Sequence, residues 1–443
     1  PSRPFLSFVS FFSLALSNNM PKRDFDLVLY GATGFTGSLV AEYLAKSAPE
    51  GLVWAIAGRN EQKLDKLADN LAAEFDCDRP GVLVAHSHTM SELNALARST
   101  KVVISTVGPY AELGSDLVAA CVAAGTHYTD LTGESIWVRR MIDKYHATAA
   151  RSNTAIVCSA GFDCLPSDLG TLVAARHLHR THNLRAETAE HVWVKSQLTI
   201  SGGSIATAIC MTENESPKEV RECAANVGYL TVDGRAPPGA AALVPAVPPV
   251  YDEQLGQYKI STSLSAVNTR HVHRTRSLFA NNSSADNPFA DNFSFTELKA
   301  VKSWMSGLIA GITSVLFMLA LSLAPTRWLL KKVLPKPGEG PSKEQMAKGF
   351  FEGHVRVESS ADPRTGTRRR VTSLVRIDGD PGYAKTAVML ANTGISLALD
   401  GVKSGRGGVV TPAYAIGDAL IDRLTSEAAN SDIVLRVIED IEA

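Results

Sequence analysis

The stretch Leu27–Gly37, "LVLYGATGFTG", joins a short apolar run to three glycines that recur at every third residue. The residues "DLVLY" are mostly apolar, β-branched or aromatic, which is typical of a buried parallel strand. The residues that follow, "SLVAEYLAKSA", repeat apolar side chains at the spacing of a helix. The glycines therefore lie in a turn that leads from a strand into a helix.

Each glycine has a separate physical reason in such a turn. Gly31 permits the tight turn, Gly34 lets the backbone approach a pyrophosphate, and Gly37 lets the helix pack closely on the strand. The first amides of the helix, together with its dipole, favour bound phosphates. A turn without a ligand is the alternative. We predict a dinucleotide-binding turn formed by Gly31, Thr33, Gly34, Phe35, Thr36 and Gly37.

The next predicted strand, "LVWAIAGRN" (52–60), indicates which dinucleotide binds. An NAD enzyme usually places Asp or Glu at its end, on the ribose 2′-hydroxyl. Arg59 stands there instead, and a guanidinium can bind a 2′-phosphate and stack on adenine. The sequence therefore favours NADPH, with a solvated surface arginine as the alternative.

A later predicted strand, "KVVISTVGPY" (101–110), should end beside the nicotinamide or its ribose. Its last residues are expected to contact the cofactor through their backbone: Ser105, Thr106, Val107, Gly108 and Pro109.

The tyrosines argue against the commonest chemistry for this glycine pattern. Short-chain dehydrogenases carry a catalytic Tyr-x-x-x-Lys pair, and none of the 10 tyrosines of this chain has a lysine four residues later.

Five separated motifs indicate another family. They are "GATGFTG" with "AGR", "GTHYTDLTGE" (125–134), "SAGFDCLPSDLG" (159–170), "SGGSIATA" (201–208) and "PGEGPS" (337–342). In this order they resemble the saccharopine dehydrogenase-like oxidoreductase family, from about Phe25 to the C-terminus. That family includes bacterial trans-acting enoyl reductases of lipid synthesis and animal proteins associated with lipid droplets. The resemblance implies hydride transfer to a lipid-like substrate, such as an enoyl thioester.

The residues alone do not identify a catalytic acid. Asp163 and Ser167 act in the site or only cap the helix that begins near them. Asp130 and Glu134 have a catalytic role or only brace a loop, and His127 is a packed core histidine or a proton donor.

The alternation of strands and helices predicts an α/β fold with a Rossmann-like parallel sheet in an NADP-binding domain, residues 25–171. A second α+β domain on an antiparallel sheet is expected over residues 172–381. Its strands include "EHVWVKSQLTI", "QYKISTSLSAV" and a hairpin around "ADPRTGT". "PPGAAALVPAVPPV" is a Pro-rich connector and "LFANNSSADNPFADNF" a polar loop. Residues 382–443 read as two helices, which the resemblance returns to the first domain.

Residues 1–24 are interpreted as a leader outside the fold. "FLSFVSFFSLAL" (5–16) is either a signal-peptide core or sequence upstream of a start at Met20. The 6 cysteines are scattered without a CxxC pair, which favours reduced thiols and predicts no metal site. A net charge of −1 does not suggest a nucleic-acid partner.

Residues 303–326 contain no charged side chain. Twenty helical residues span about 30 Å, the thickness of a bilayer core. Tryptophans and basic residues flank the segment, namely Trp304, Trp328, Lys299, Lys302, Arg327, Lys331 and Lys332. A buried core helix is the alternative. We expect this segment to associate with the cytosolic face of a membrane or with a lipid droplet.

Three functions remain open. The first is an NADPH-dependent oxidoreductase acting on a lipid-like substrate at a membrane surface, with a role in lipid or glycolipid metabolism. The second is a membrane or droplet scaffold that binds NADPH without turnover. The third is a saccharopine reductase of lysine synthesis, whose substrate carboxylates should demand clustered basic residues.

Overall fold

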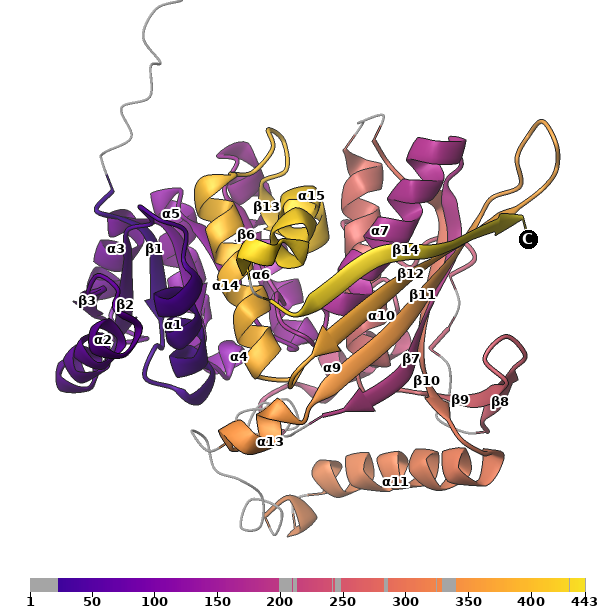
Figure 1. Cartoon of the computed structure of the whole chain (residues 1–443), viewed down its shortest axis with the longest axis horizontal. Helices are drawn as coiled ribbons and strands as arrows, with labels where there is room; N and C mark the ends of the chain where they lie inside the picture. The colour runs from indigo at the N-terminus through magenta and orange to yellow at the C-terminus, as the bar shows by residue number, and fades with distance from the viewer. Residues whose placement is uncertain are drawn as a thin grey trace, which may run out of the picture.

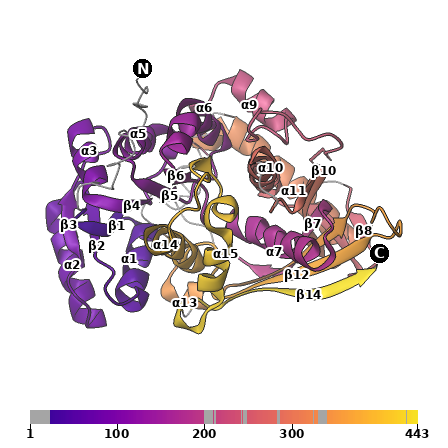
Figure 2. The same cartoon turned by 90° about the horizontal axis from the view of Figure 1, so that it is seen from above.

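The computed structural model describes residues 23–198, 209, 213–240, 242–243, 248–282, 286–323, 325–328, 340–429 and 431–442. The leader predicted before residue 23 and the "SGGSIATA" motif lie outside the described residues. Two seven-stranded sheets form the framework of the described chain, and they lie side by side in Figures 1 and 2.

Sheet A is parallel, in the order β13-β6-β5-β4-β1-β2-β3. Its strands are β1 (Phe25–Tyr30), β2 (Trp54–Gly58), β3 (Gly81–Val84), β4 (Thr100–Ser105), β5 (His127–Asp130), β6 (Ala155–Val157) and β13 (Gly408–Val410). The connecting helices are α1 (Phe35–Ser47), α2 (Glu61–Phe75), α3 (Met90–Ser99), α4 (Tyr110–Leu113), α5 (Ser115–Ala124) and α6 (Ser135–Arg151). The strand order reverses between β1 and β4, where a dinucleotide binds in such sheets.

Sheet B has the order β14-β12-β11-β7-β10-β9-β8 and is antiparallel except where β7 meets β10. Its strands are β7 (Ala186–Gln197), β8 (Val250–Asp252), β9 (Gln257–Ser261), β10 (Phe289–Val301), β11 (Phe350–Ser359), β12 (Arg369–Asp378) and β14 (Ile433–Glu442). Helix α7 (Leu165–His182) packs on β7, β11, β12 and β14, and α10 (Ser265–Asn281) packs on β10. The other helices of this region are α9 (Pro217–Ala225), α11 (Trp304–Ser322) and α13 (Lys343–Ala347). The fold class and the β11–β12 hairpin predicted from the sequence are confirmed.

Two sequence predictions need correction in this region. The strand predicted across "QYKISTSLSAV" ends at Ser261, and its second half begins α10. The side chain of Thr262 accepts a hydrogen bond from the amide of Leu264, which turns the chain there. The polar loop predicted up to Phe293 is shorter, because β10 begins at Phe289.

The C-terminal segment returns to sheet A, as the family resemblance implied. Helix α14 (Ala384–Leu399) packs against α1, β1, β4 and β5, and α15 (Pro412–Thr425) packs against α7 and α14. Two strands missed by the sequence accompany them. Strand β13 extends sheet A beside β6, and β14, after the 3-10 turn η1 (Glu427–Ala429), forms the edge of sheet B.

One helix in the described part of the chain is long and apolar enough to cross a membrane by length and composition. It is the segment Trp304–Leu321 of α11, with a mean hydropathy of 1.9, of which only 18% is buried. Figure 1 shows α11 lying along the outside of the molecule, below sheet B. It rests on β9 and β10 near Gly307, where an added Cβ would lie 2.8 Å from the ring of Pro249.

Candidate cofactor and substrate site

The glycine turn between β1 and α1 has the shape of a phosphate cradle. Gly31 has a φ of +91°, which favours glycine. An added Cβ on Gly37 would lie 2.1 Å from the carbonyl oxygen of Gly31, so Gly37 is needed by the protein itself. A Cβ on Gly34 would meet only that oxygen, at 3.3 Å, and Gly34 is exposed. The space above Gly34 is therefore open to a ligand.

The first turn of α1 is left free for an anion. No side chain in the described part of the protein caps this helix, and its first turn holds no acidic residue. The hydroxyl of Thr106, from the loop after β4, donates to the carbonyl oxygens of Tyr30 and Gly31 at 3.2 Å. This contact fixes the turn against the neighbouring loop, and the free helical amides suit a pyrophosphate.

Arg59 lies at the end of β2, next to β1, and its side chain is exposed. The residue after it, Asn60, caps α2 by accepting a hydrogen bond from the amide of Lys63 at 2.9 Å. Arg59 makes no side-chain hydrogen bond or ion pair to any described residue, so its guanidinium is available for a 2′-phosphate.

The loop after β4 contains the remaining predicted cofactor contacts, Ser105 to Pro109, and the Gly108–Pro109 bond is cis. Glu134 fixes this loop, since its two carboxylate oxygens accept the amides of Tyr110 and Ala111, both at 2.8 Å. Burial raises the pKa of Glu134. Its carboxylate thus caps α4, the bracing role considered in the sequence.

Asp130 braces the neighbouring loops in the same way. Its Oδ1 accepts the amides of Thr132 at 3.0 Å and Ser159 at 2.9 Å, which joins the loops after β5 and β6. The side chain is fully buried, and burial raises its pKa to about 6. His127 lies at the other end of β5, where its Nδ1 accepts the amide of Ala155 and burial lowers its pKa to about 4. It is a packed, neutral histidine away from the cofactor edge.

Asp163 is the acid of these loops that has no hydrogen-bond partner among the described residues. It does not cap α7, whose N-cap is Cys164. Solvent reaches the carboxylate, although protein surrounds it closely, and an added Cβ on Gly133 would lie 3.8 Å from its Oδ2. Burial and the nearby charge of Glu297 raise the pKa of Asp163 to about 6. This acid therefore exchanges its proton at a pH of about 6.

Ser167 also caps nothing and instead joins a buried polar network. Its hydroxyl donates to Glu297 Oε2 at 2.7 Å and lies 2.8 Å from His191 Nδ1, which must then be the donor to the hydroxyl. Asn268 and Thr262 also donate to Glu297, both at 2.6 Å. Burial would raise the pKa of Glu297, but these hydrogen bonds and His191 lower it. The network therefore stabilises the buried negative charge of Glu297, which lies near Asp163.

An aromatic cluster holds the loop that carries Asp163. Its neighbour Phe162 packs on Trp193 and Phe351 of sheet B, with ring centroids 5.8 Å and 5.0 Å away. On the side of the glycine turn, Phe35 contacts Tyr383 and Gly340. The "PGEGPS" motif thus ends against the cofactor turn.

Sequence reasoning placed the glycine turn, Arg59 and the loop after β4, and the structure brings these together at one edge of sheet A. It missed Glu297 and His191. They lie on β10 and β7, and no motif marks a lone acid or histidine within a strand.

Comparisons with known proteins agree with this site. The model of the saccharopine dehydrogenase NADP-binding domain matches residues 27–157. A candidate trans-acting enoyl reductase of Mycobacterium tuberculosis is 37% identical over 419 residues, covering 91% of this chain and 96% of its own. The trans-acting enoyl reductase of Mycobacterium ulcerans is 35% identical over 430 residues, with the same coverage of 91% and 96%.

The fold also matches a solved structure, the saccharopine dehydrogenase (L-Glu forming) of Saccharomyces cerevisiae. The TM-score is 0.50 at 13% identity, covering 94% of this chain and 99% of that one. The cofactor cradle, the matching NADP-binding domain and the full-length relatives lead to one conclusion: this chain belongs to the saccharopine dehydrogenase-like oxidoreductases and uses NADP(H).

Proposed function

We propose that this protein reduces an enoyl thioester or a similar lipid-like substrate with NADPH, at the cytosolic face of a membrane or on a lipid droplet. The names of its relatives support the reaction, and a role in lipid or glycolipid metabolism follows from it. The observation that carries the proposal is that one molecule combines an NADP cradle, an acid with a raised pKa beside it in the same edge loops, and an exposed apolar helix.

The glycine turn, Arg59 and Asp163 have separate roles in the proposed reaction. NADPH, when bound, supplies the hydride for one carbon of the double bond. The glycine turn would hold its pyrophosphate, and Arg59 would hold its 2′-phosphate. Asp163 holds the proton that the other carbon takes up, and solvent returns a proton to Asp163 afterwards. Both atoms added to the double bond are thus accounted for.

The charges near Asp163 favour an acyl substrate over one with several carboxylates. The charged group that acts on Asp163 is another acid, Glu297. A saccharopine reductase would need basic side chains to hold its substrate there. That function is therefore the weaker candidate for this site.

The exposed apolar side chains of helix α11 support the proposed location at a lipid surface. A row of apolar side chains on it is 45% to 59% exposed, formed by Met305, Ile309, Ile312, Val315, Leu316, Phe317 and Leu319. An exposed apolar surface of this size marks a contact with lipid or with another protein. The strands before and after α11 in the sequence, β10 and β11, belong to the same sheet. A span would separate them, so α11 lies flat on the lipid surface.

NADPH oxidation by the purified protein tests the proposal, with enoyl thioesters of increasing chain length, in the presence and absence of anionic vesicles. We expect turnover that increases with chain length and with vesicles. NADPH binding without turnover of any enoyl thioester would instead support the scaffold alternative. Turnover restricted to saccharopine-type substrates would support the third function.

A further inference from the structure

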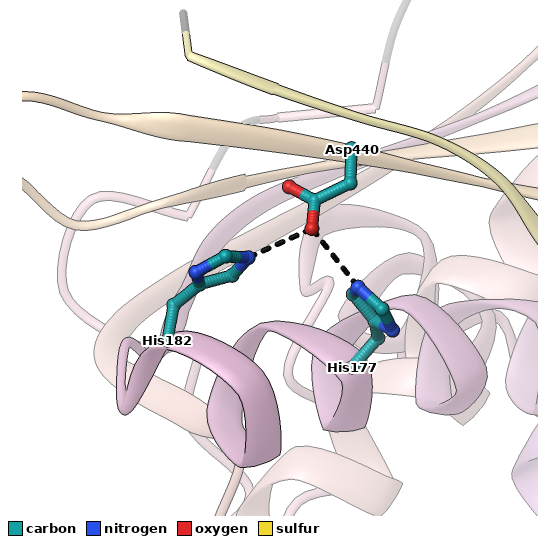
Figure 3. Close-up of side chains that lie close together, drawn as sticks. All are labelled: His177, His182 and Asp440. Atoms are coloured by element: carbon teal, nitrogen blue, oxygen red, sulfur yellow. Dashed lines mark hydrogen bonds and ion pairs between the residues drawn. The ribbon is translucent and has the colours of Figure 1, made fainter.

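Three metal-ligating side chains converge at the end of sheet B, away from the cofactor site (Figure 3). His177 and His182 come from the last turns of α7, and Asp440 comes from β14. The Nε2 atoms of the two histidines lie 3.0 Å and 2.7 Å from one oxygen, Asp440 Oδ2. All three ligand atoms lie within 4.8 Å of one another.

Asp440 Oδ1 already accepts a hydrogen bond from Arg369, which leaves Oδ2 to face the two histidines. Arg369 donates to Oδ1 at 3.0 Å and lies 3.7 Å from a carboxylate oxygen of Glu442. With neutral imidazoles the two carboxylates outweigh this single guanidinium, so the site carries a net negative charge. The side chains of His177, His182 and Asp440 are 33%, 19% and 25% exposed, so water can reach them.

We propose that His177 Nε2, His182 Nε2 and Asp440 Oδ2 bind a divalent transition-metal ion such as Zn²⁺, with water as a fourth ligand. Two imidazoles and a carboxylate form a donor set that zinc accepts. With bonds of about 2.0–2.2 Å, tetrahedral ligand atoms lie about 3.4 Å apart. The present separations need only small side-chain rotations to reach that geometry. Arg369 would orient the carboxylate from outside the coordination sphere.

The position of the site indicates a structural role. Among the described strands, the edge strand β14 pairs with β12 alone, and the ion would join it to α7. The C-terminal end of β14 lies at the end of the molecule opposite β1 and β2 (Figure 1). The ion would therefore stabilise the last strand and take no part in hydride transfer.

Titration of the tag-free full chain, stripped with EDTA and desalted, tests this proposal at pH 7.5. We expect one equivalent of Zn²⁺ to bind and the Tm to rise with it. Co²⁺ should bind at the same stoichiometry, with the visible absorption of a four- or five-coordinate ion. His182→Ala and Asp440→Asn should each weaken Zn²⁺ binding by at least tenfold, since each removes a ligand.

His88→Ala is the matched control, because His88 forms an exposed histidine–aspartate pair, 3.5 Å from Asp116. It should leave Zn²⁺ binding unchanged. No saturable binding by the wild-type chain, or binding that His182→Ala and His177→Ala both leave intact, would overturn the proposal. The wild-type Co²⁺ spectrum decides the question even if a variant fails to fold.

Discussion

Gly34 and Gly37 face opposite constraints although only three residues separate them. A Cβ on Gly37 would collide with the backbone of Gly31 at 2.1 Å, whereas a Cβ on Gly34 would touch it at 3.3 Å. The fold therefore requires the second glycine, and we propose that the first is required by the cofactor.

Gly34→Val should abolish NADPH binding while the chain stays folded, since the new side chain would occupy the phosphate space. Gly37→Ala should destabilise the protein by about 1–3 kcal/mol or more, the cost of overpacking. Fluorescence titration with NADPH and thermal unfolding measure the two effects. Micromolar NADPH affinity in Gly34→Val would show that the turn does not hold the phosphates.

Arg59→Ala should weaken NADPH binding by about 1–3 kcal/mol, the range of a charge-assisted contact, and leave NADH binding unchanged. Arg98, another exposed arginine of this domain, provides the control variant Arg98→Ala. Titration calorimetry with both cofactors gives the ratio of the dissociation constants for NADPH and NADH. An unchanged preference in Arg59→Ala would exclude Arg59 as the 2′-phosphate ligand.

Asp163 should make kcat depend on pH around the pKa of its carboxyl group. A proton donor must be protonated, and the pKa of this carboxyl is raised to about 6. We therefore expect kcat to fall as the pH rises through about 6. Asp163→Asn should lower kcat by about 10²–10⁴-fold and leave the Kd for NADPH unchanged. Asp143→Asn, at an exposed site, is the control. A rate that increases with pH in the wild type would exclude this role.

The same pKa has a consequence for stability. A carboxyl whose folded pKa lies above its unfolded value stabilises the fold at low pH, and this contribution is lost as the pH rises through about 6. Asp163→Asn should therefore unfold at a higher temperature than the wild type above pH 6. The difference should disappear below pH 4, as scanning calorimetry across that range would show.

Helix α11 should carry the binding to lipid. Ile309→Asp and Leu316→Asp remove side chains that are 59% and 58% exposed. Each should weaken sedimentation with anionic vesicles by about tenfold or more, because an apolar side chain of this size contributes about 1.5–3 kcal/mol when buried. Val53→Asp, at a site 52% exposed elsewhere, is the control. Equal vesicle binding by all three variants would assign the membrane contact to another surface.

A second measurement tests whether α11 lies on the membrane or spans it. Protease sites inserted near Asp78, before α11, and near Arg364, after it, should both be cut from the cytosolic side of isolated membranes. Both positions are exposed in the turns before β3 and after β11. Protection of one site alone would demonstrate a true span.

Local patterns in the sequence predict the cofactor half of the site. The glycines, Arg59 and the end of β4 lie on elements whose periodicity is strong, and parallel strands bring their carboxyl ends to one edge. The proposed proton donor, by contrast, could not be chosen from the sequence. Asp130, Glu134 and Asp163 look alike as acids, and only the structure shows that two of them bind amides while the third has no hydrogen-bond partner among the described residues.

The missed strands have a different cause. Strand β13 has only three residues, too few for an alternation to appear. Strand β14 is an edge strand whose exposed face carries charged residues, so its pattern gives little sign of burial. Glu297 is buried only because four side chains from distant segments surround its carboxylate, a circumstance that no local window contains.

The chain crosses between the two sheets three times, since β1 to β6 lie in sheet A, β7 to β12 in sheet B, β13 in A and β14 in B. During synthesis, therefore, neither sheet can be completed before the other is nearly finished. Sheet A is complete only once residue 410 has been synthesised, and sheet B only once residue 442 has been synthesised. The nascent protein cannot fold one domain after the other as it leaves the ribosome, and truncation before residue 408 would leave both sheets one strand short.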